Sequence, residues 1–291
     1  MERAEPQGLG LDRRQMLAAG AAAGLMPGGL AFAQVPGLAL SGKYQQSGFA
    51  FGRTAPRAQI LVNDKPVGLA SAEGLFVIGF DRDEPSAAKL TVARADASAV
   101  HQFQVAPVDY DVQRINGLPL DQVTPTNPAL LARIHEEAVR KAVGFASNID
   151  QDYFRTGFAM PVQGARLSAR FGGQRILDGV PERPHYGTDL AAPIGTPVHA
   201  PCKALVCFAE TGLHYEGGLI LLDHGQGLIS AYLHLSKVEV REGQTVEQGE
   251  RIGAVGKEGR ATGPHLCWRM KWRDRYMDPL QMVGVRAPSA A

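Results

Sequence analysis

Short apolar runs separated by polar turn residues fill the chain between residues 36 and 115. Runs of this length and spacing are typical of the strands of a small antiparallel sandwich. The segment holds no motif for chemistry, so we predict an immunoglobulin-like accessory domain. The clearest runs span residues 59–62, 75–80, 89–93 and 100–105.

A proline-rich linker and a helix are expected next. Three prolines occur from Pro119 to Pro128, which predicts a linker. Asn127 can cap a helix that has Pro128 in its first turn, because an Asn side chain accepts hydrogen bonds from the free amide groups there. Apolar residues then recur at steps of three and four and predict a buried stripe. The stripe comprises Leu130, Leu131, Ile134, Ala138 and Val139.

From Phe158 onward, apolar runs alternate with glycines. Two runs, 219–222 and 228–235, flank Gly225-Gln226-Gly227 and predict a β-hairpin. We therefore expect a mostly β protein with an N-terminal sandwich, a helical linker and a β-rich C-terminal domain. The expected parts are a targeting segment 1–33, the sandwich 34–116, the linker 117–150, the C-terminal domain 151–284 and a tail 285–291.

The first 33 residues have the pattern of an export signal. Arg13 and Arg14 stand before an Ala- and Gly-rich apolar stretch that ends in Ala31-Phe32-Ala33. Paired arginines, an apolar run and an A-x-A cleavage site in this order resemble a twin-arginine signal. Cleavage after Ala33 would yield a mature chain that begins at Gln34, in the periplasm or outside the cell.

Composition narrows the class of protein. Of 291 residues, 45% are hydrophobic and 20% charged, and the formal net charge is +1. These values are those of a soluble globular protein and exclude the strongly basic surface of a nucleic-acid binder. No apolar run in the mature chain is long enough for a membrane span. Three cysteines are too few for a disulfide scaffold, and we expect Cys202 and Cys207 to be free.

Two segments carry candidate metal ligands. The first reads His185-Tyr186-Gly187-Thr188-Asp189, and the second reads Gly263-Pro264-His265-Leu266-Cys267-Trp268. His265 and Cys267 are two residues apart, so on a strand they point to the same face. Gly187 lets the backbone turn so that His185 and Asp189 converge. His, Asp and Cys are all zinc ligands, and the two segments together predict a zinc site.

The two motifs, H-x-G-x-D and G-P-H-L-x before an aromatic residue, resemble those of the lysostaphin-type zinc endopeptidases. The resemblance extends from Phe158 to Pro279. It implies that Zn²⁺ is held by His185, Asp189 and position 267, and that His265 and His234 are the catalytic histidines. It also implies hydrolysis of cross-links between the stem peptides of bacterial peptidoglycan. Because a free wall hydrolase endangers its cell, we also expect a regulatory protein partner.

Cys267 stands where active members of that family usually carry a second His. A thiolate binds zinc well, but together with Asp189 it would neutralise both charges of the ion. A less positive metal activates water less, so we predict a slower enzyme. Two alternatives stay open. One is a weak or inactive scaffold that binds cell wall or activates an amidase, and the other is a zinc peptidase for protein substrates.

Overall fold

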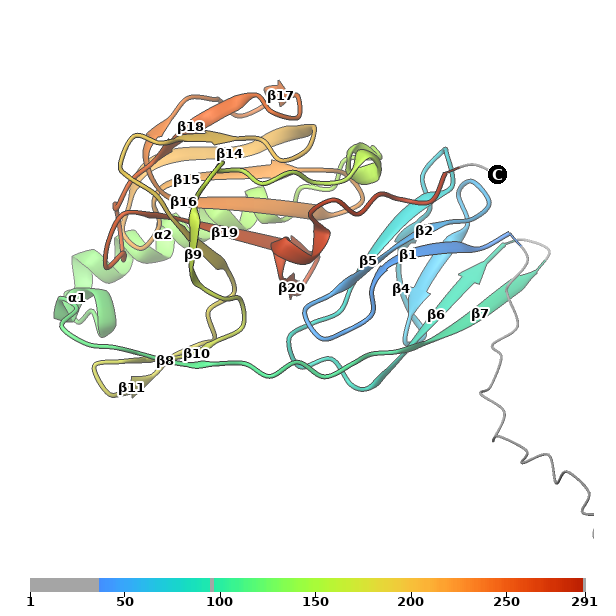
Figure 1. Ribbon diagram of the computed structural model, residues 1–291, viewed down its shortest axis with the longest axis horizontal. Coiled ribbons are helices and arrows are strands. Elements are labelled where there is room, and N and C mark those ends of the chain that lie inside the picture. Colours follow the sequence, from blue (N-terminus) through green and yellow to red (C-terminus); the bar gives the residue numbers. More distant parts are fainter. Residues whose placement is uncertain (1–36, 95–96, 290–291) are drawn as a thin grey trace, which may run out of the picture. The chain divides into compact units, whose positions relative to one another are not determined.

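The computed structural model describes residues 37–94 and 97–289 (Figure 1). The expected export signal, residues 1–33, lies outside the described residues. Within the described ranges, no helix combines the length and the apolar character that crossing a membrane requires. Strands dominate the described chain, which confirms the predicted mostly β fold.

Two antiparallel sheets form the N-terminal part. The first has the order β1-β2-β5 and the second β4-β3-β6-β7. Side chains from strands of both sheets, among them Phe51, Leu90 and Phe103, are fully buried. The predicted sandwich is thus present, and the four predicted runs coincide with β3, β5, β6 and β7. The strands are β1 (Ala39–Lys43), β2 (Phe49–Arg53), β3 (Gln59–Val62), β4 (Lys65–Leu69), β5 (Leu75–Gly79), β6 (Ala87–Ala93) and β7 (Ser98–Gln104).

The chain then crosses to a small sheet that the sequence did not predict. Strand β8 (Val112–Ile115) runs parallel to β10 (Gln174–Leu177), which is itself antiparallel to β11 (Val180–Pro181). The partners β8 and β10 are separated by a long stretch of chain that includes both α1 (Leu120–Val123) and α2 (Pro128–Phe145). Strand β8 therefore joins the C-terminal part through backbone hydrogen bonds.

Helix α2 begins as predicted but buries a different face. The side chain of Asn127 accepts hydrogen bonds from the amides of Ala129 and Leu130. The expected apolar stripe is partly wrong, because Leu131 and Val139 are 45% and 54% exposed. The helix instead buries Gly144 and Glu137.

Two contacts explain which face of α2 is buried. At Gly144 a Cβ would come within 2.9 Å of the Leu221 and Phe208 side chains, so glycine permits close approach to the sheet. Glu137 accepts hydrogen bonds from the His214 amide and from Arg133. These polar bonds compensate the burial of its carboxylate.

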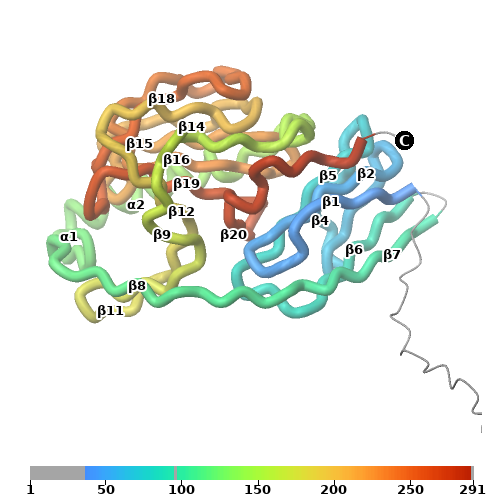
Figure 2. Tube along the Cα trace, in the orientation of Figure 1, coloured from blue at the N-terminus to red at the C-terminus, as the bar shows by residue number. Residues whose placement is uncertain are grey.

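A ten-stranded sheet forms the C-terminal part, with the central order β17-β14-β15-β16-β19-β12-β9 (Figure 2). Strands β15 and β16 are antiparallel and are joined at Gly225–Gly227, which confirms the predicted hairpin. Of the remaining strands, β18 pairs with β16 and β13, and β20 pairs with β19. The elements are η1 (Tyr153–Thr156), β9 (Arg166–Ala169), β12 (Thr188–Ala191), β13 (Pro197–His199), β14 (Ala204–Leu213), β15 (Gly217–Asp223), β16 (Leu228–Val238), β17 (Thr245–Val246), β18 (Arg251–Val255), β19 (His265–Trp272), β20 (Arg275–Met277) and η2 (Pro279–Met282).

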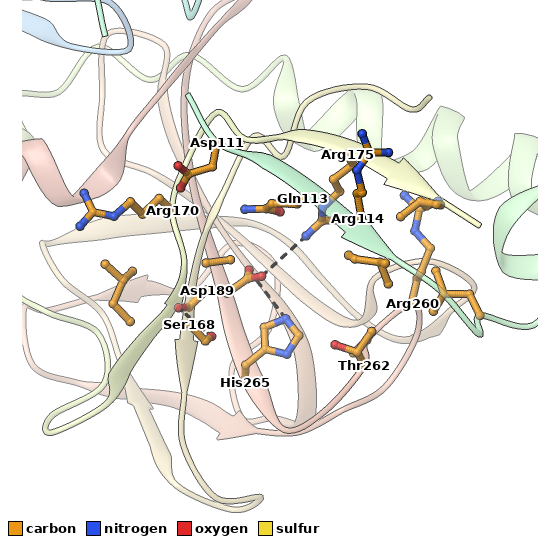
Figure 3. Close-up of a pocket in the computed structure, with 16 residues that line it drawn as sticks. Asp111, Gln113, Arg114, Ser168, Arg170, Arg175, Asp189, Arg260, Thr262 and His265 are labelled. Atoms are coloured by element: carbon orange, nitrogen blue, oxygen red, sulfur yellow. Dashed lines mark hydrogen bonds and ion pairs between the residues drawn. The ribbon is translucent and has the colours of Figure 1, made fainter. Parts of the chain in front are cut away.

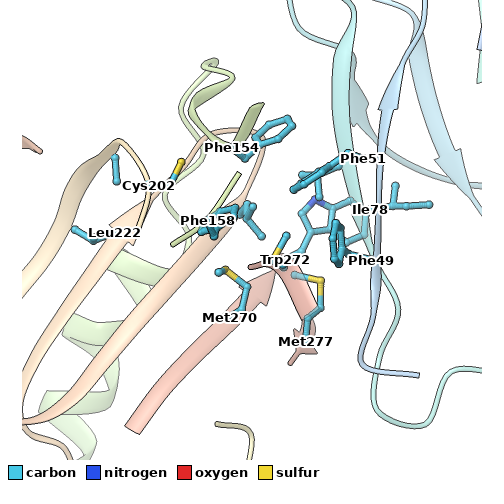
Figure 4. Close-up of a cluster of buried hydrophobic side chains, with 14 of the residues drawn as sticks. Phe49, Phe51, Ile78, Phe154, Phe158, Cys202, Leu222, Met270, Trp272 and Met277 are labelled. Carbon is cyan, nitrogen blue, oxygen red and sulfur yellow. The ribbon is translucent and has the colours of Figure 1, made fainter. Parts of the chain in front are cut away.

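One apolar cluster joins the sandwich to the large sheet (Figure 4). The rings of Phe51 and Phe154 stack with centroids 5.2 Å apart. Beside this cluster, Arg275 donates hydrogen bonds to the Gly79 carbonyl and to the carboxylate of Glu84. Burial of large side chains from both parts stabilises their association.

Candidate active site

Three neighbouring strands, β12, β19 and β16, bring the two motifs together. In the sheet register, Asp189 of β12 lies opposite Cys267 of β19, and Cys267 lies opposite Leu233 of β16. His234 therefore follows directly on the strand next to Cys267. Antiparallel pairing places these positions within side-chain reach of one another.

The three predicted ligands meet in a buried cluster. One donor atom from each of His185, Asp189 and Cys267 lies within 4.8 Å of the others. Nε2 of His185 is 3.3 Å from Sγ of Cys267 and 3.2 Å from Oδ1 of Asp189. All three side chains are buried.

The cluster fits a divalent cation. Oδ1 of Asp189, which faces Nε2 of His185, is buried without a hydrogen bond, and leaving a buried polar atom unpaired is costly. At Gly187 a Cβ would approach Sγ of Cys267 to 2.6 Å, so glycine is required for the ligands to converge. A set of imidazole, carboxylate and thiol donors suits Zn²⁺.

His185 and Asp189 are held in the protonation states that a metal requires. Burial lowers the pKa of His185 to about 4, so its imidazole is neutral at pH 7. Burial alone raises the pKa of the Asp189 carboxyl, but nearby His185 and the positive charge of Arg175 outweigh it and the net pKa is lowered. A neutral imidazole and a carboxylate are the ligand forms.

Cys267 differs from its partners, because burial raises the pKa of its thiol to about 12. Two arginines oppose this rise. The guanidinium groups of Arg269 and Arg175 each lower the pKa of Cys267, although burial outweighs them. Arg175 also lies 3.6 Å from Oδ2 of Asp189. Arg269 and Arg175 therefore place positive charge near Sγ of Cys267.

His265 and His234 present free nitrogens beside this cluster. Their ring centroids are 4.8 Å apart. Nδ1 of His265 lies 2.7 Å from the Gly263 carbonyl, and Nδ1 of His234 lies 2.8 Å from the Glu258 carbonyl. A carbonyl oxygen only accepts, so each Nδ1 carries a hydrogen and each neutral ring keeps a free lone pair on Nε2.

The backbone at His234 is strained. Its φ of 65° lies in the left-handed region, where a non-glycine residue is uncommon. The amide of His234 donates to the Glu216 carbonyl, 2.8 Å away, and burial lowers the pKa of its imidazole to about 3. Strain of this kind persists where the surrounding structure holds it, and it is frequent at functional sites.

A cavity of about 600 Å³ opens over the cluster (Figure 3). Asp189 and His265 lie on its floor, and Ser168, Arg175 and Arg260 are among the residues that line it. Strand β8 supplies part of its wall through residues 113–115. A peptide in this cavity would lie against the candidate metal ligand Asp189 and the candidate catalytic residue His265.

Comparison with known proteins agrees with this geometry. Residues 183–279 match Peptidase family M23. A crystal structure from Pseudomonas aeruginosa assigned to peptidase M23 superposes with a TM-score of 0.63 and 30% sequence identity, over 83% of this chain and 96% of that one. The chain belongs to peptidase family M23. The resemblance to lysostaphin-type peptidases is thereby confirmed.

Two curated relatives of this M23 protein come from Vibrio cholerae. The peptidoglycan DD-endopeptidase ShyA is 40% identical over 128 residues, which are 43% of this chain and 29% of the relative. The peptidoglycan DD-endopeptidase ShyB is 38% identical over 98 residues, which are 34% of this chain and 23% of the relative. The chain thus spans less than a third of the length of these relatives.

The sequence proposed five candidate site residues, but it did not indicate most of the residues that surround them. Arg269 shares the strand face of His265 and Cys267, so the two-residue period of β19 could have indicated it. Nothing in the sequence indicated Arg175 or the residues of β8, because only the pairing of β8 with β10 brings this strand to the cavity. The structure places His185, Asp189, Cys267, His265 and His234 together.

Proposed function

We propose that this M23 protein is a zinc-dependent endopeptidase that hydrolyses peptide cross-links of bacterial peptidoglycan. The proposal rests on one observation, the buried His185, Asp189 and Cys267 cluster with two imidazoles beside it at a cavity. Similarity to two peptidoglycan DD-endopeptidases of Vibrio cholerae supports the substrate class.

His185, Asp189 and Cys267 would hold the zinc, which when bound supplies a Lewis acid for the scissile carbonyl and for water. His265 lies beside this cluster, with its Nε2 3.7 Å from Oδ1 of Asp189. Its free lone pair can accept the proton of the attacking water. Once protonated, the same Nε2–H can donate to the leaving amine.

His234 is the second imidazole, and its ring centroid lies 4.8 Å from that of His265. Its low pKa keeps the ring neutral at pH 7, and the Glu258 carbonyl keeps its hydrogen on Nδ1. The ring orientation is therefore set before substrate binds, as preorganised catalysis requires. We assign His234 to orient the water by accepting a hydrogen bond at Nε2, while His265 takes the proton.

The exchange of His for Cys at position 267 favours a second candidate, a weak or inactive scaffold. A thiolate would make the ligand set more negative and lower the acidity of water at the site. Arg269 and Arg175 lie close enough to shift the pKa of Cys267 and oppose this effect. We therefore favour a slower enzyme over a scaffold.

We further propose that residues 1–33 are a twin-arginine export signal and that the mature chain acts in the periplasm or outside the cell. In the same proposal residues 34–116 are an accessory domain, 117–150 a linker, 151–284 the peptidase domain and 285–291 a tail. A regulatory protein partner would restrain the hydrolase, since uncontrolled cross-link cleavage is harmful.

Digestion of purified sacculi tests the function. The zinc-loaded chain 34–291 is compared with a chelated sample and with His265→Ala, and the released fragments are read by mass spectrometry. Cross-linked dimers that resolve into monomers only in the zinc-loaded sample support the endopeptidase. Intact cross-links with zinc bound would establish the scaffold instead.

A further inference from the structure

Arginines dominate the walls of the cavity over the candidate active site. Arg114 on β8, Arg170 beyond the end of β9, Arg175 on β10 and Arg260 in the loop before β19 all line it. Only two carboxylates, Asp111 and Asp189, line the same cavity. Asp189 already lies in the candidate metal cluster, so the cavity carries an excess of positive charge.

Three of the four arginines gather at one side. Figure 3 shows Arg114, Arg175 and Arg260 on the side away from Arg170 and Asp111, with Asp189 and His265 between the two groups. Within the ranges 37–94 and 97–289, neither Arg114 nor Arg260 forms an ion pair with a carboxylate. Of the three arginines, only Arg175 has an acidic partner, Asp189, so the charges of Arg114 and Arg260 are left without a carboxylate in the described ranges.

Arg260 is held in place although it has no acidic partner. Its Nη1 donates to the Gln122 carbonyl over 3.2 Å, and its guanidinium lies 4.8 Å from the ring centroid of Tyr215. Stacking on an aromatic face and a backbone bond leave other N–H groups of the planar fork available. The charge is thus positioned in advance rather than mobile in solvent.

Arg175 lies 3.6 Å from Asp189, so part of its charge is already met. Arg114 and Arg260 line the same cavity and have no carboxylate partner in the described ranges. Close guanidinium groups with few counter-charges attract an anion, and carboxylates are bound well because they can accept two parallel N–H bonds. An anion that enters the cavity would come to rest next to the candidate catalytic centre.

We propose that Arg114 and Arg260 form a carboxylate-binding subsite, so that the enzyme selects peptides with a free carboxylate beside the scissile bond. This inference rests on the proposed endopeptidase function and adds a substrate class to it. Uncharged cross-links such as glycine bridges would be poor substrates. The carboxylate can come from a peptide C-terminus or from a diamino-acid residue next to the bond.

The subsite extends beyond the part of the chain that matches the family, because only Arg260 lies within that part. Arg114 precedes the matched residues 183–279, and it reaches the cavity only because β8 pairs with β10. Selectivity would then depend on the segment that connects the sandwich to the peptidase fold. This segment would act as part of the binding site rather than only as a connection.

Paired synthetic substrates test the subsite. Cross-linked peptides that differ only in carboxylate or carboxamide, at the C-terminus or at the diamino-acid residue, are cleaved by the zinc-loaded chain 34–291. We expect kcat/KM to be roughly 10- to 100-fold higher for the acid at one of these two positions. Arg114→Gln and Arg260→Gln should each reduce this preference by about tenfold, mainly through KM.

Two comparisons separate a specific contact from a general positive field. Arg170→Gln removes the same charge from the other side of the cavity and should keep the preference. Arg260→Lys keeps the charge but loses the fork, and it should recover only part of the preference. The subsite would be overturned if Arg170→Gln lost as much of the preference as Arg260→Gln does. It would also be overturned if the unmodified protein cleaved acid and amide equally.

Binding measurements keep the subsite testable apart from turnover. Zinc-loaded His265→Ala is titrated calorimetrically with the acid and amide peptides, alone and combined with Arg114→Gln. The subsite is supported if the acid peptide binds more tightly than the amide and Arg114→Gln abolishes this difference. This holds even if the unmodified protein cleaves neither peptide. Absence of cleavage would refute the endopeptidase function but not the subsite. Equal binding of acid and amide would refute the subsite. Circular dichroism confirms that each variant is folded.

Discussion

Sγ of Cys267 lies 3.3 Å from Nε2 of His185, although 82 positions separate the two residues along the chain. The contact exists because β12 and β19 are adjacent and in a register that sets Asp189 opposite Cys267. The unusual sulfur therefore sits inside the ligand cluster, where its effect on the chemistry can be measured.

We expect Cys267→His to raise kcat/KM several-fold on peptidoglycan fragments. A neutral imidazole leaves the metal more positive than a thiolate does, so it activates water more strongly. The zinc content is measured with the rate, and Cys207→Ala serves as the control because Cys207 lies outside the cluster. A fall in rate with zinc retained would show that the site is tuned to sulfur.

Removal of either imidazole should abolish most activity and leave the metal bound. His265→Ala and His234→Ala are each expected to lower kcat by about 100-fold or more, the usual contribution of a positioned acid–base group. Neither side chain belongs to the three-ligand cluster, so bound zinc should stay near one equivalent. The exposed helix residue His135 provides the control, His135→Ala. Loss of zinc in His265→Ala would assign that residue to the ligand set instead.

Gly187→Ala should weaken zinc binding by roughly 10- to 100-fold, the range seen when groups that orient ligands are changed. The added Cβ would meet Sγ of Cys267 at 2.6 Å and Cγ of Arg269 at 3.0 Å, so the ligands must shift. Gly263→Ala is the matched control, because no atom lies within 4 Å of a Cβ there. Zinc affinities come from competition with a chromophoric chelator. Equal affinities of the two variants would contradict the tight ligand packing described above.

The free energy of unfolding of the metal-free protein should decrease as the pH falls below about 6.5. Burial lowers the pKa of His224 to about 4, and the ring is held by the Lys203 carbonyl and by Ser230. The unfolded chain protonates His224 near pH 6.5, whereas the folded protein does so only near pH 4. The contribution of neutral His224 to the free energy of unfolding is therefore complete above pH 6.5 and is lost as the pH falls towards 4. At pH 4.5 His224 alone should cost on the order of 2 kcal/mol.

Urea unfolding at pH 7.5, 6 and 4.5 measures this loss, and His224→Gln should flatten the curve. His185 and His234 have lowered pKa values for the same reason, burial, and so part of the slope should stay in this variant. An unchanged slope in His224→Gln would show that His224 is not the buried titrating group we describe.

Sequence patterns alone determined the local features of this protein. Alternating apolar runs defined the sandwich strands, Gly225–Gly227 defined a hairpin, and Asn127 defined the start of α2. These features depend on neighbouring residues, whose spacing is readable directly. The five candidate site residues were also proposed from the sequence, because their motifs are short and chemically specific.

Tertiary structure alone decided what surrounds those residues. The pairing of β8 with β10 joins positions about sixty residues apart, and no local pattern specifies a parallel partner at that distance. The same pairing carries Arg114 to the cavity. The exposure of Leu131 and Val139 was likewise decided by contact, since Gly144 rather than a bulky side chain lets α2 approach the sheet. Local periodicity predicts which elements form, but the contacts between distant elements determine which side chains the active site receives.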